Sequence, residues 1–174
     1  HGTGVCGSIG AAAAASLLSG ADAEQLMTAI SLAATSAAGL LEVTADDSQI
    51  KPHNVANAAS TGLQAGLAGL AGYLPPEDIL GGSRGLIKVL TGQRIHDDWD
   101  LSSQGKAEIM GVYFKPYAAC RHSHPAIEAA LYLRDQIDSL DQIEAIDVYS
   151  YKLAIQGHDH REVSSVASAK MSTP

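Results

Sequence analysis

The stretch Lys115-Pro-Tyr-Ala-Ala-Cys-Arg-His-Ser-His-Pro-Ala-Ile127 gathers more proton-transfer and anion-binding side chains than any other part of the chain. The relevant side chains are those of Lys115, Tyr117, Cys120, Arg121, His122 and His124. An arginine fork binds a carboxylate at two points, and histidine exchanges protons near neutral pH. We therefore predict an anion site, with a carboxylate as the best match. The alternative is a polar loop whose side chains only cap a helix and face water.

Two predicted elements flank this stretch. The apolar run Ile109–Phe114 is typical of a short strand, and residues 126–137 carry apolar side chains near helical spacing. Pro125 suits the first position of that helix, where its missing N–H would be unpaired anyway. Arg121 and the histidines would then lie at a helix N-terminus, where free N–H groups and the helix dipole favour negative charge.

The first half of the chain predicts helices made of small residues. We expect these helices over residues 4–19, 23–38 and 55–71, with short ones over 77–80 and 86–90. Five consecutive alanines favour the first helix, and Gly20 is placed to end it. Asp22 and Asn54 are the expected N-caps of the second and third. Because the helices are rich in Gly, Ala and Ser nearly all round, they are expected to pack with their backbones close together.

A second group of hydrogen-bond donors, Lys51-Pro-His53-Asn54, lies at the start of the third predicted helix. Such donors could bind an anion at the positive end of the helix dipole. An ordinary capped helix start explains the same residues. Both interpretations remain open on spacing alone.

The second half of the chain differs in character. Residues 143–153 alternate partly at period two and are rich in Val, Ile and Tyr, so they predict a strand that pairs with the one at 109–114. A helix near the C-terminus is expected to begin at Ser164. The chain is thus mainly α with a small α+β part. The expected divisions are a Gly/Ala-rich helical-bundle segment over 1–92, a linker over 93–108 and the start of an α+β lid domain over 109–174.

Composition excludes several classes of function. The 174 residues carry a net charge of −8, which argues against a nucleic-acid partner. Hydrophobic residues make up 46% and aromatic ones 5%, and no run reaches the length and apolarity of a membrane span. The cysteines, Cys6 and Cys120, form no C-x-x-C pair, so free thiols in a reducing, cytoplasmic compartment are expected.

No cofactor is expected from the motifs. Gly4-x-x-Gly7-x-x-Gly10 follows no strand and matches neither dinucleotide nor P-loop spacing. The group His96-Asp-Asp98 has nothing nearby to complete a metal ligand set. The group His158-Asp-His160, in a loop after a predicted strand, is interpreted as solvated.

Three blocks, in order and spacing, resemble the MmgE/PrpD family. They are His1-Gly-Thr-Gly-Val-Cys-Gly-Ser-Ile-Gly-Ala-Ala-Ala-Ala-Ala15, Ile50-Lys-Pro-His-Asn-Val-Ala-Asn57 and Phe114-Lys-Pro-Tyr-Ala-Ala-Cys-Arg-His-Ser-His-Pro-Ala-Ile127. This family includes 2-methylcitrate dehydratases, cis-aconitate decarboxylases and iminodisuccinate epimerases. The resemblance implies a large helical domain plus an α+β lid, a homodimer, and no metal or organic cofactor. The chain resembles the middle of such a protein, which is longer.

The resemblance also implies a set of site residues. Those expected to be catalytic are His1, Lys51, Lys115 and His124. Those expected to bind substrate are His53, Asn54, Tyr117, Cys120, Arg121 and His122. Asn54 stands where the family commonly has a histidine. Cys120 stands where the decarboxylase branch has a catalytic histidine, which argues against that reaction.

Together these residues predict a hydro-lyase for a small polycarboxylate such as 2-methylcitrate. Lys51, Lys115 and Arg121 would hold carboxylates and stabilise the charge that develops when a proton leaves the adjacent carbon. His1 or His124 would move the proton. The site is expected between the helical part and the lid, whose closure would exclude water. An epimerase, a decarboxylase or a catalytically incomplete segment are the alternatives.

Overall fold

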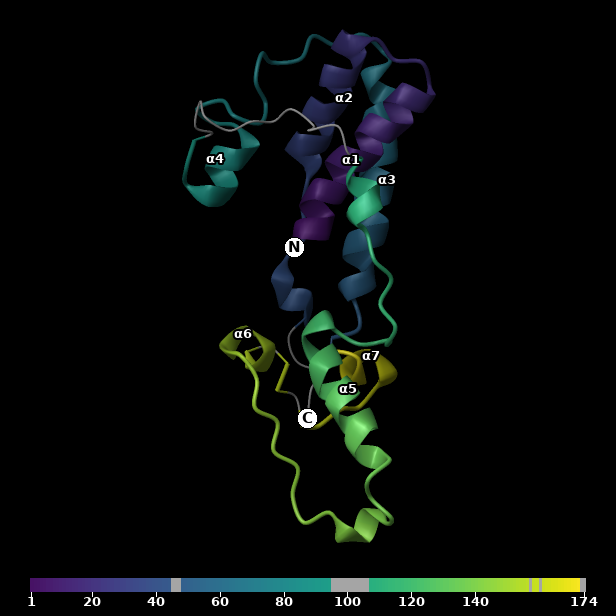
Figure 1. Cartoon of the computed structure of the whole chain (residues 1–174). Helices are drawn as coiled ribbons and strands as arrows, with labels where there is room; N and C mark the ends of the chain where they lie inside the picture. The colour runs from purple at the N-terminus through teal and green to yellow at the C-terminus, as the bar shows by residue number, and fades with distance from the viewer. Residues whose placement is uncertain (45–47, 95–106, 157, 160, 173–174) are drawn as a thin grey trace. The chain divides into compact units, whose positions relative to one another are not determined.

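The computed structural model describes residues 1–44, 48–94, 107–156, 158–159 and 161–172. Its α-helices are α1 (Gly2–Leu18), α2 (Ala23–Ser36), α3 (Lys51–Gly69), α4 (Leu86–Thr91), α5 (His124–Arg134), α6 (Lys152–Ile155) and α7 (Val166–Ala169) (Figure 1). Its 3₁₀ turns are η1 (Leu41–Thr44), η2 (Glu108–Gly111), η3 (Arg121–Ser123) and η4 (Leu140–Gln142). The mainly α prediction is confirmed.

Helices α1, α2 and α3 pack side by side and make up most of the first of two compact units, residues 1–41 with 50–104 (Figure 1). Glycines on α3 allow this approach. A Cβ on Gly62 would lie 2.5 Å from the Cβ of Ala11, and one on Gly66 would lie 2.7 Å from the Cβ of Ala15. Both distances are too short for real atoms. The backbones of α1 and α3 therefore lie as close as the predicted small-residue helices require.

The interior of this unit consists of small side chains. The buried core cluster is Ala12, Ala29, Ala33 and Ala65, with Ile9 and Leu32 packed against it. Buried hydroxyls bond to carbonyls of their own helix, as when Ser8 Oγ donates to the Gly4 carbonyl at 2.7 Å. Such local bonds satisfy a polar group that packing has removed from water.

The predicted helix limits, 4–19 and 23–38, agree with α1 and α2 to within two residues. Gly20 follows α1 with φ +80°, a left-handed conformation suited to glycine. Asp22 caps α2 by accepting from the Gln25 N–H at 2.9 Å, and the Gln25 side chain returns a bond to the Asp22 N–H at 3.0 Å. This reciprocal pair is a capping box.

The predicted start of the third helix was wrong. Helix α3 begins at Lys51, and its cap is Ile50 rather than Asn54. Pro52 lies in the first turn, where a missing N–H costs nothing, so the helix extends back through it. The short helix expected over 77–80 is also absent, because Asp78 closes a turn by accepting from the Gly81 N–H at 2.7 Å.

The second compact unit comprises residues 42–49 and 105–174. In its described part, neither predicted strand forms. The first half of 109–114 belongs to η2, with the Val112 N–H donating to the Ile109 carbonyl at 3.2 Å. Residues 143–151 are irregular, and no described segment pairs with them. Without a partner for its N–H and C=O groups, a run rich in β-branched residues gains nothing from strand geometry.

Helices α4, α5 and α7 form near the predicted positions. In α5, Pro125 occupies the first turn as expected. The predicted linker 93–108 falls mostly outside the described residues, as does the group at 96–98, so the predicted domain limits stay a prediction. Among described residues, no helix combines the length and apolar character that crossing a bilayer requires.

The approach of α1 and α3 gives a first prediction. Replacing Gly62 by Ala should lower the free energy of unfolding by about 1–3 kcal/mol, because the new methyl overlaps Ala11 and the Ser8 carbonyl. Gly10→Ala, on exposed α1 surface with nothing within 4 Å of the new Cβ, should raise it by up to about 1 kcal/mol. Urea titrations followed by circular dichroism measure both. Equal effects of the two changes would contradict close packing at Gly62.

Candidate functional site

In the first unit, the predicted site residues lie at two helix starts. His1 caps α1, where its Nδ1 accepts from the Gly4 N–H at 3.3 Å. The main-chain nitrogen of His1 donates to the Gly39 carbonyl at 2.8 Å. These two bonds hold the start of α1 against the segment that follows α2.

Asn54 reaches the same segment from α3. It is buried, and its Nδ2 donates to the Leu40 carbonyl at 3.2 Å. A Cβ on Gly39, whose φ is +138°, would lie 3.4 Å from both Asn54 Cγ and His1 Cβ. His1 and Asn54 therefore meet at Gly39.

Lys51 and His53 belong to the first turn of α3. Lys51 is half-buried and His53 is exposed. The main-chain N–H of His53 donates to the Ile50 carbonyl at 2.9 Å and so belongs to the first turn of the helix. The two cationic or titratable side chains thus lie at the positive end of a long helix.

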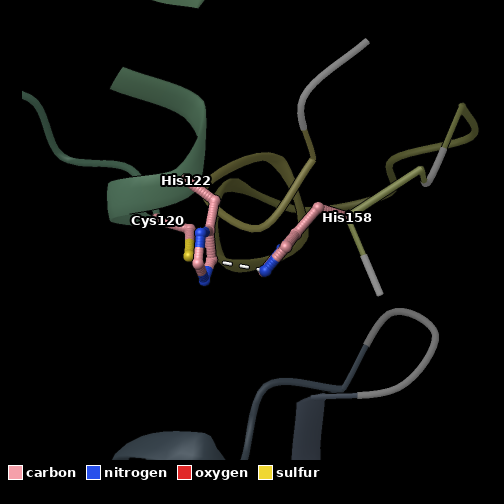
Figure 2. Close-up of side chains that lie close together, drawn as sticks. All are labelled: Cys120, His122 and His158. Carbon is pink, nitrogen blue, oxygen red and sulfur yellow. Dashed lines mark hydrogen bonds between the residues drawn. The ribbon is translucent and has the colours of Figure 1, made fainter. Parts of the chain in front are cut away.

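In the second unit, Cys120 joins residues that lie far along the chain. Its N–H donates to the Lys170 carbonyl at 2.8 Å, just past α7. Its Sγ lies 3.5 Å from His158 Nε2 (Figure 2). On the other side of the ring, His158 Nδ1 lies 2.9 Å from the Met171 carbonyl. A carbonyl only accepts, so Nδ1 carries the proton and Nε2 presents a lone pair to the sulfur.

His122 completes this group. Its Nδ1 is hydrogen-bonded to the Tyr151 hydroxyl at the start of α6, and its ring centre lies 5.4 Å from that of His158. One ligand atom each from Cys120, His122 and His158 lies within 4.8 Å of the others, and all three residues are half-buried (Figure 2). These three residues could hold a metal ion.

His124 and Tyr117 form a separate pair. The imidazole of His124 is fully buried and meets Tyr117 edge to face with 5.2 Å between ring centres. Its Nε2 lies 3.4 Å from the Ala119 carbonyl, whereas Nδ1 has no hydrogen-bond partner among the described residues. The ring supports the loop before α5 from inside.

The two cations of this stretch lie on its outside. Arg121 is exposed, with its guanidinium carbon 5.6 Å from the centre of the Tyr113 ring. Lys115 is also exposed, and its Nζ donates weakly to the Ala119 carbonyl at 3.5 Å. A cation over an aromatic face is held in place while remaining available to an anion.

Most of the chain matches the two domains of one known protein family. Residues 1–97 match the MmgE/PrpD N-terminal domain, and residues 117–174 match the MmgE/PrpD C-terminal domain. The chain belongs to the MmgE/PrpD family. No curated protein and no solved structure matches it.

Family membership confirms the resemblance drawn from the three sequence blocks. Within each unit, the structure brings some of the predicted residues of this MmgE/PrpD protein together: His1 with Asn54, Tyr117 with His124, and Cys120 with His122. Lys51 and Arg121 belong to different units, so their joint grip on one substrate stays a prediction.

The interpretation of His158 as a solvated loop residue was wrong. His158 is half-buried and bonds to Cys120 and Met171, while Tyr151, which sequence reasoning also missed, holds His122. The predicted strand over 143–153 concealed Tyr151, because it placed that side chain on a sheet, and the predicted loop after the strand left His158 in water. The available signal was chemical: a cysteine and histidines are the residues that gather at metal and thiol sites.

The buried amide of Asn54 gives a second prediction. Asn54→Ala should lower the free energy of unfolding by about 1 kcal/mol, because the Leu40 carbonyl loses its donor. Gln64→Ala is the matched control, since that exposed amide on the same helix donates to the exposed Ser60 hydroxyl. Its effect should stay within about 0.5 kcal/mol. If urea titrations show that both variants lose the same free energy of unfolding, the Asn54 bond to Leu40 does not stabilise the fold.

Proposed function

We propose that this MmgE/PrpD protein is a hydro-lyase that acts on a small polycarboxylate such as 2-methylcitrate. Membership of the family supports a dehydratase-type reaction. The observation that carries the choice of substrate is that Lys115 and Arg121, in the segment that leads into α5, are both exposed. A multiply charged acid needs more than one cation, and a guanidinium binds a carboxylate at two points.

The chemistry follows from carbon acidity. Breaking a C–H bond beside a carboxylate leaves negative charge that spreads into that carboxylate, where a cation stabilises it. The electron pair then forms the C=C bond as the C–O bond to the β-hydroxyl breaks. The hydroxyl takes up a proton and leaves as water. Charge stabilisation by groups held in position before the reaction begins is usually the largest single contribution to catalysis.

The two histidines predicted to move the proton, His1 and His124, differ in how far they are buried. His124 is fully buried and bonds within its own loop, so the proposal gives it a positioning role for Tyr117. His1 is half-buried, with Nδ1 accepting from a main-chain N–H, which leaves Nε2 as the ring atom for proton transfer. His1 is therefore the residue that takes the proton from carbon.

Binding of a tricarboxylate tests the anion site. Calorimetric titration with 2-methylcitrate should show that Arg121→Ala weakens binding by about 1.5–3 kcal/mol, the scale of a charged hydrogen bond. Arg134→Ala is the control, because that exposed arginine lies at the end of α5 and pairs with the adjacent Asp135. Unchanged binding by the Arg121 variant would take this residue out of the site.

Turnover distinguishes the reactions within the family. The protein should convert 2-methylcitrate into the unsaturated tricarboxylate plus water. Proton nuclear magnetic resonance measures this conversion. Citrate, cis-aconitate and iminodisuccinate complete the panel. Loss of carbon dioxide from cis-aconitate, or inversion of iminodisuccinate, without dehydration of either citrate would replace the proposal by a decarboxylase or an epimerase.

A further inference from the structure

We infer that Cys120, His122 and His158 form a binding site for a thiophilic divalent metal ion, with Zn²⁺ as the ion that fits best. The three residues come from two segments brought together by the fold: Cys120 and His122 at η3, and His158 after α6. This inference concerns metal binding alone and does not depend on the proposed reaction. The expectation of no metal site, drawn from spacing in the sequence, missed His158 as a possible ligand.

The donor set indicates the ion. One thiolate and two imidazoles suit Zn²⁺, which accepts sulfur and nitrogen together, whereas Mg²⁺ and Ca²⁺ prefer oxygen. Binding forms an S–Zn bond in place of the S–H bond, and the thiol proton passes to water. Three protein ligands leave a fourth position for water or an anion.

The distance between the first two ligand atoms already matches a bound ion. In a tetrahedral site with Zn–S of about 2.3 Å and Zn–N of about 2.0–2.1 Å, sulfur and nitrogen lie about 3.6 Å apart. Cys120 Sγ and His158 Nε2 are separated by 3.5 Å. The third ligand atom, on His122, lies within 4.8 Å of both, so it must move closer by at most about 1.5 Å to complete the set.

The surroundings hold both imidazoles as metal ligands are usually held. A ligating histidine almost always donates its other N–H to a carbonyl or another oxygen, which fixes the tautomer and the ring plane. His158 Nδ1 does this with the Met171 carbonyl at 2.9 Å, so Nε2 presents its lone pair. The Tyr151 hydroxyl is hydrogen-bonded to Nδ1 of His122, so Nε2 is the ring nitrogen left for a metal when that hydroxyl accepts the bond.

The main chain also fixes the cysteine. The Cys120 N–H is bonded to the Lys170 carbonyl at 2.8 Å, one residue before the carbonyl that holds His158. Two adjacent carbonyls after α7 therefore set the position of two ligands. The same short segment of main chain therefore holds both the cysteine and the histidine in place.

Cobalt provides a direct spectroscopic test on the whole chain. Titration with Co²⁺ under reducing conditions should give the strong near-ultraviolet band of a thiolate bound to cobalt, and Zn²⁺ should displace it at one ion per chain. Cys120→Ser should lose the band and bind Zn²⁺ about tenfold or more weakly. Cys6→Ser, which removes the exposed thiol on α1, should keep both properties. If the Cys120→Ser variant keeps the band, as the Cys6→Ser variant should, the inference is overturned.

Thiol alkylation tests the site without any substitution. Zn²⁺ should protect Cys120 from iodoacetamide, whereas the exposed Cys6 in the same molecule should react at an unchanged rate. Peptide mass spectrometry reads both thiols at once. Protection of neither cysteine, or of both equally, would show that no Cys120 site exists. This result stands even if the Cys120 variant fails to fold, which circular dichroism would reveal.

Discussion

The first unit depends on the close approach of α1 and α3, which is possible because nothing larger than hydrogen stands at Gly62 and Gly66 where α1 crosses them. That approach has a consequence at the helix starts. His1 and Asn54 can both reach the turn at Gly39 because their helices lie nearly in contact. A wider spacing would separate the residue that caps α1 from the amide on α3. Packing deep in the unit thus sets the geometry of polar groups at its end.

The second unit uses hydrogen bonds for the same purpose. Its described part has few buried apolar side chains, and Phe114 is 95% exposed, so packing alone cannot position the loop before α5. Instead the carbonyls of Lys170 and Met171 hold Cys120 and His158, and Tyr151 holds His122. Bonds between residues so distant in sequence tie η3, α6 and the end of α7 into one arrangement.

The sequence predicted the family from three blocks of residues. It also predicted α1 and α2 to within two residues at each end, because capping, glycine stops and alanine propensity act locally. It failed at residues 143–151, where an alternating pattern cannot reveal that no partner strand is available. It also failed at Asn54, which resembles a cap but is buried within α3. The Cys120 and His158 contact was beyond reach for a related reason: only the chain's return through α6 brings them together.

The alanine core of the first unit also has a thermal consequence. Alanine and glycine have no rotamers to lose on burial, so fixing Ala12, Ala29 and Ala65 costs only backbone entropy. The same side chains remove little apolar surface from water, and the heat capacity of unfolding grows with that surface. The stability of this helical layer therefore follows a shallow curve with temperature, changing less between cold and warm conditions than a leucine-filled bundle of equal length.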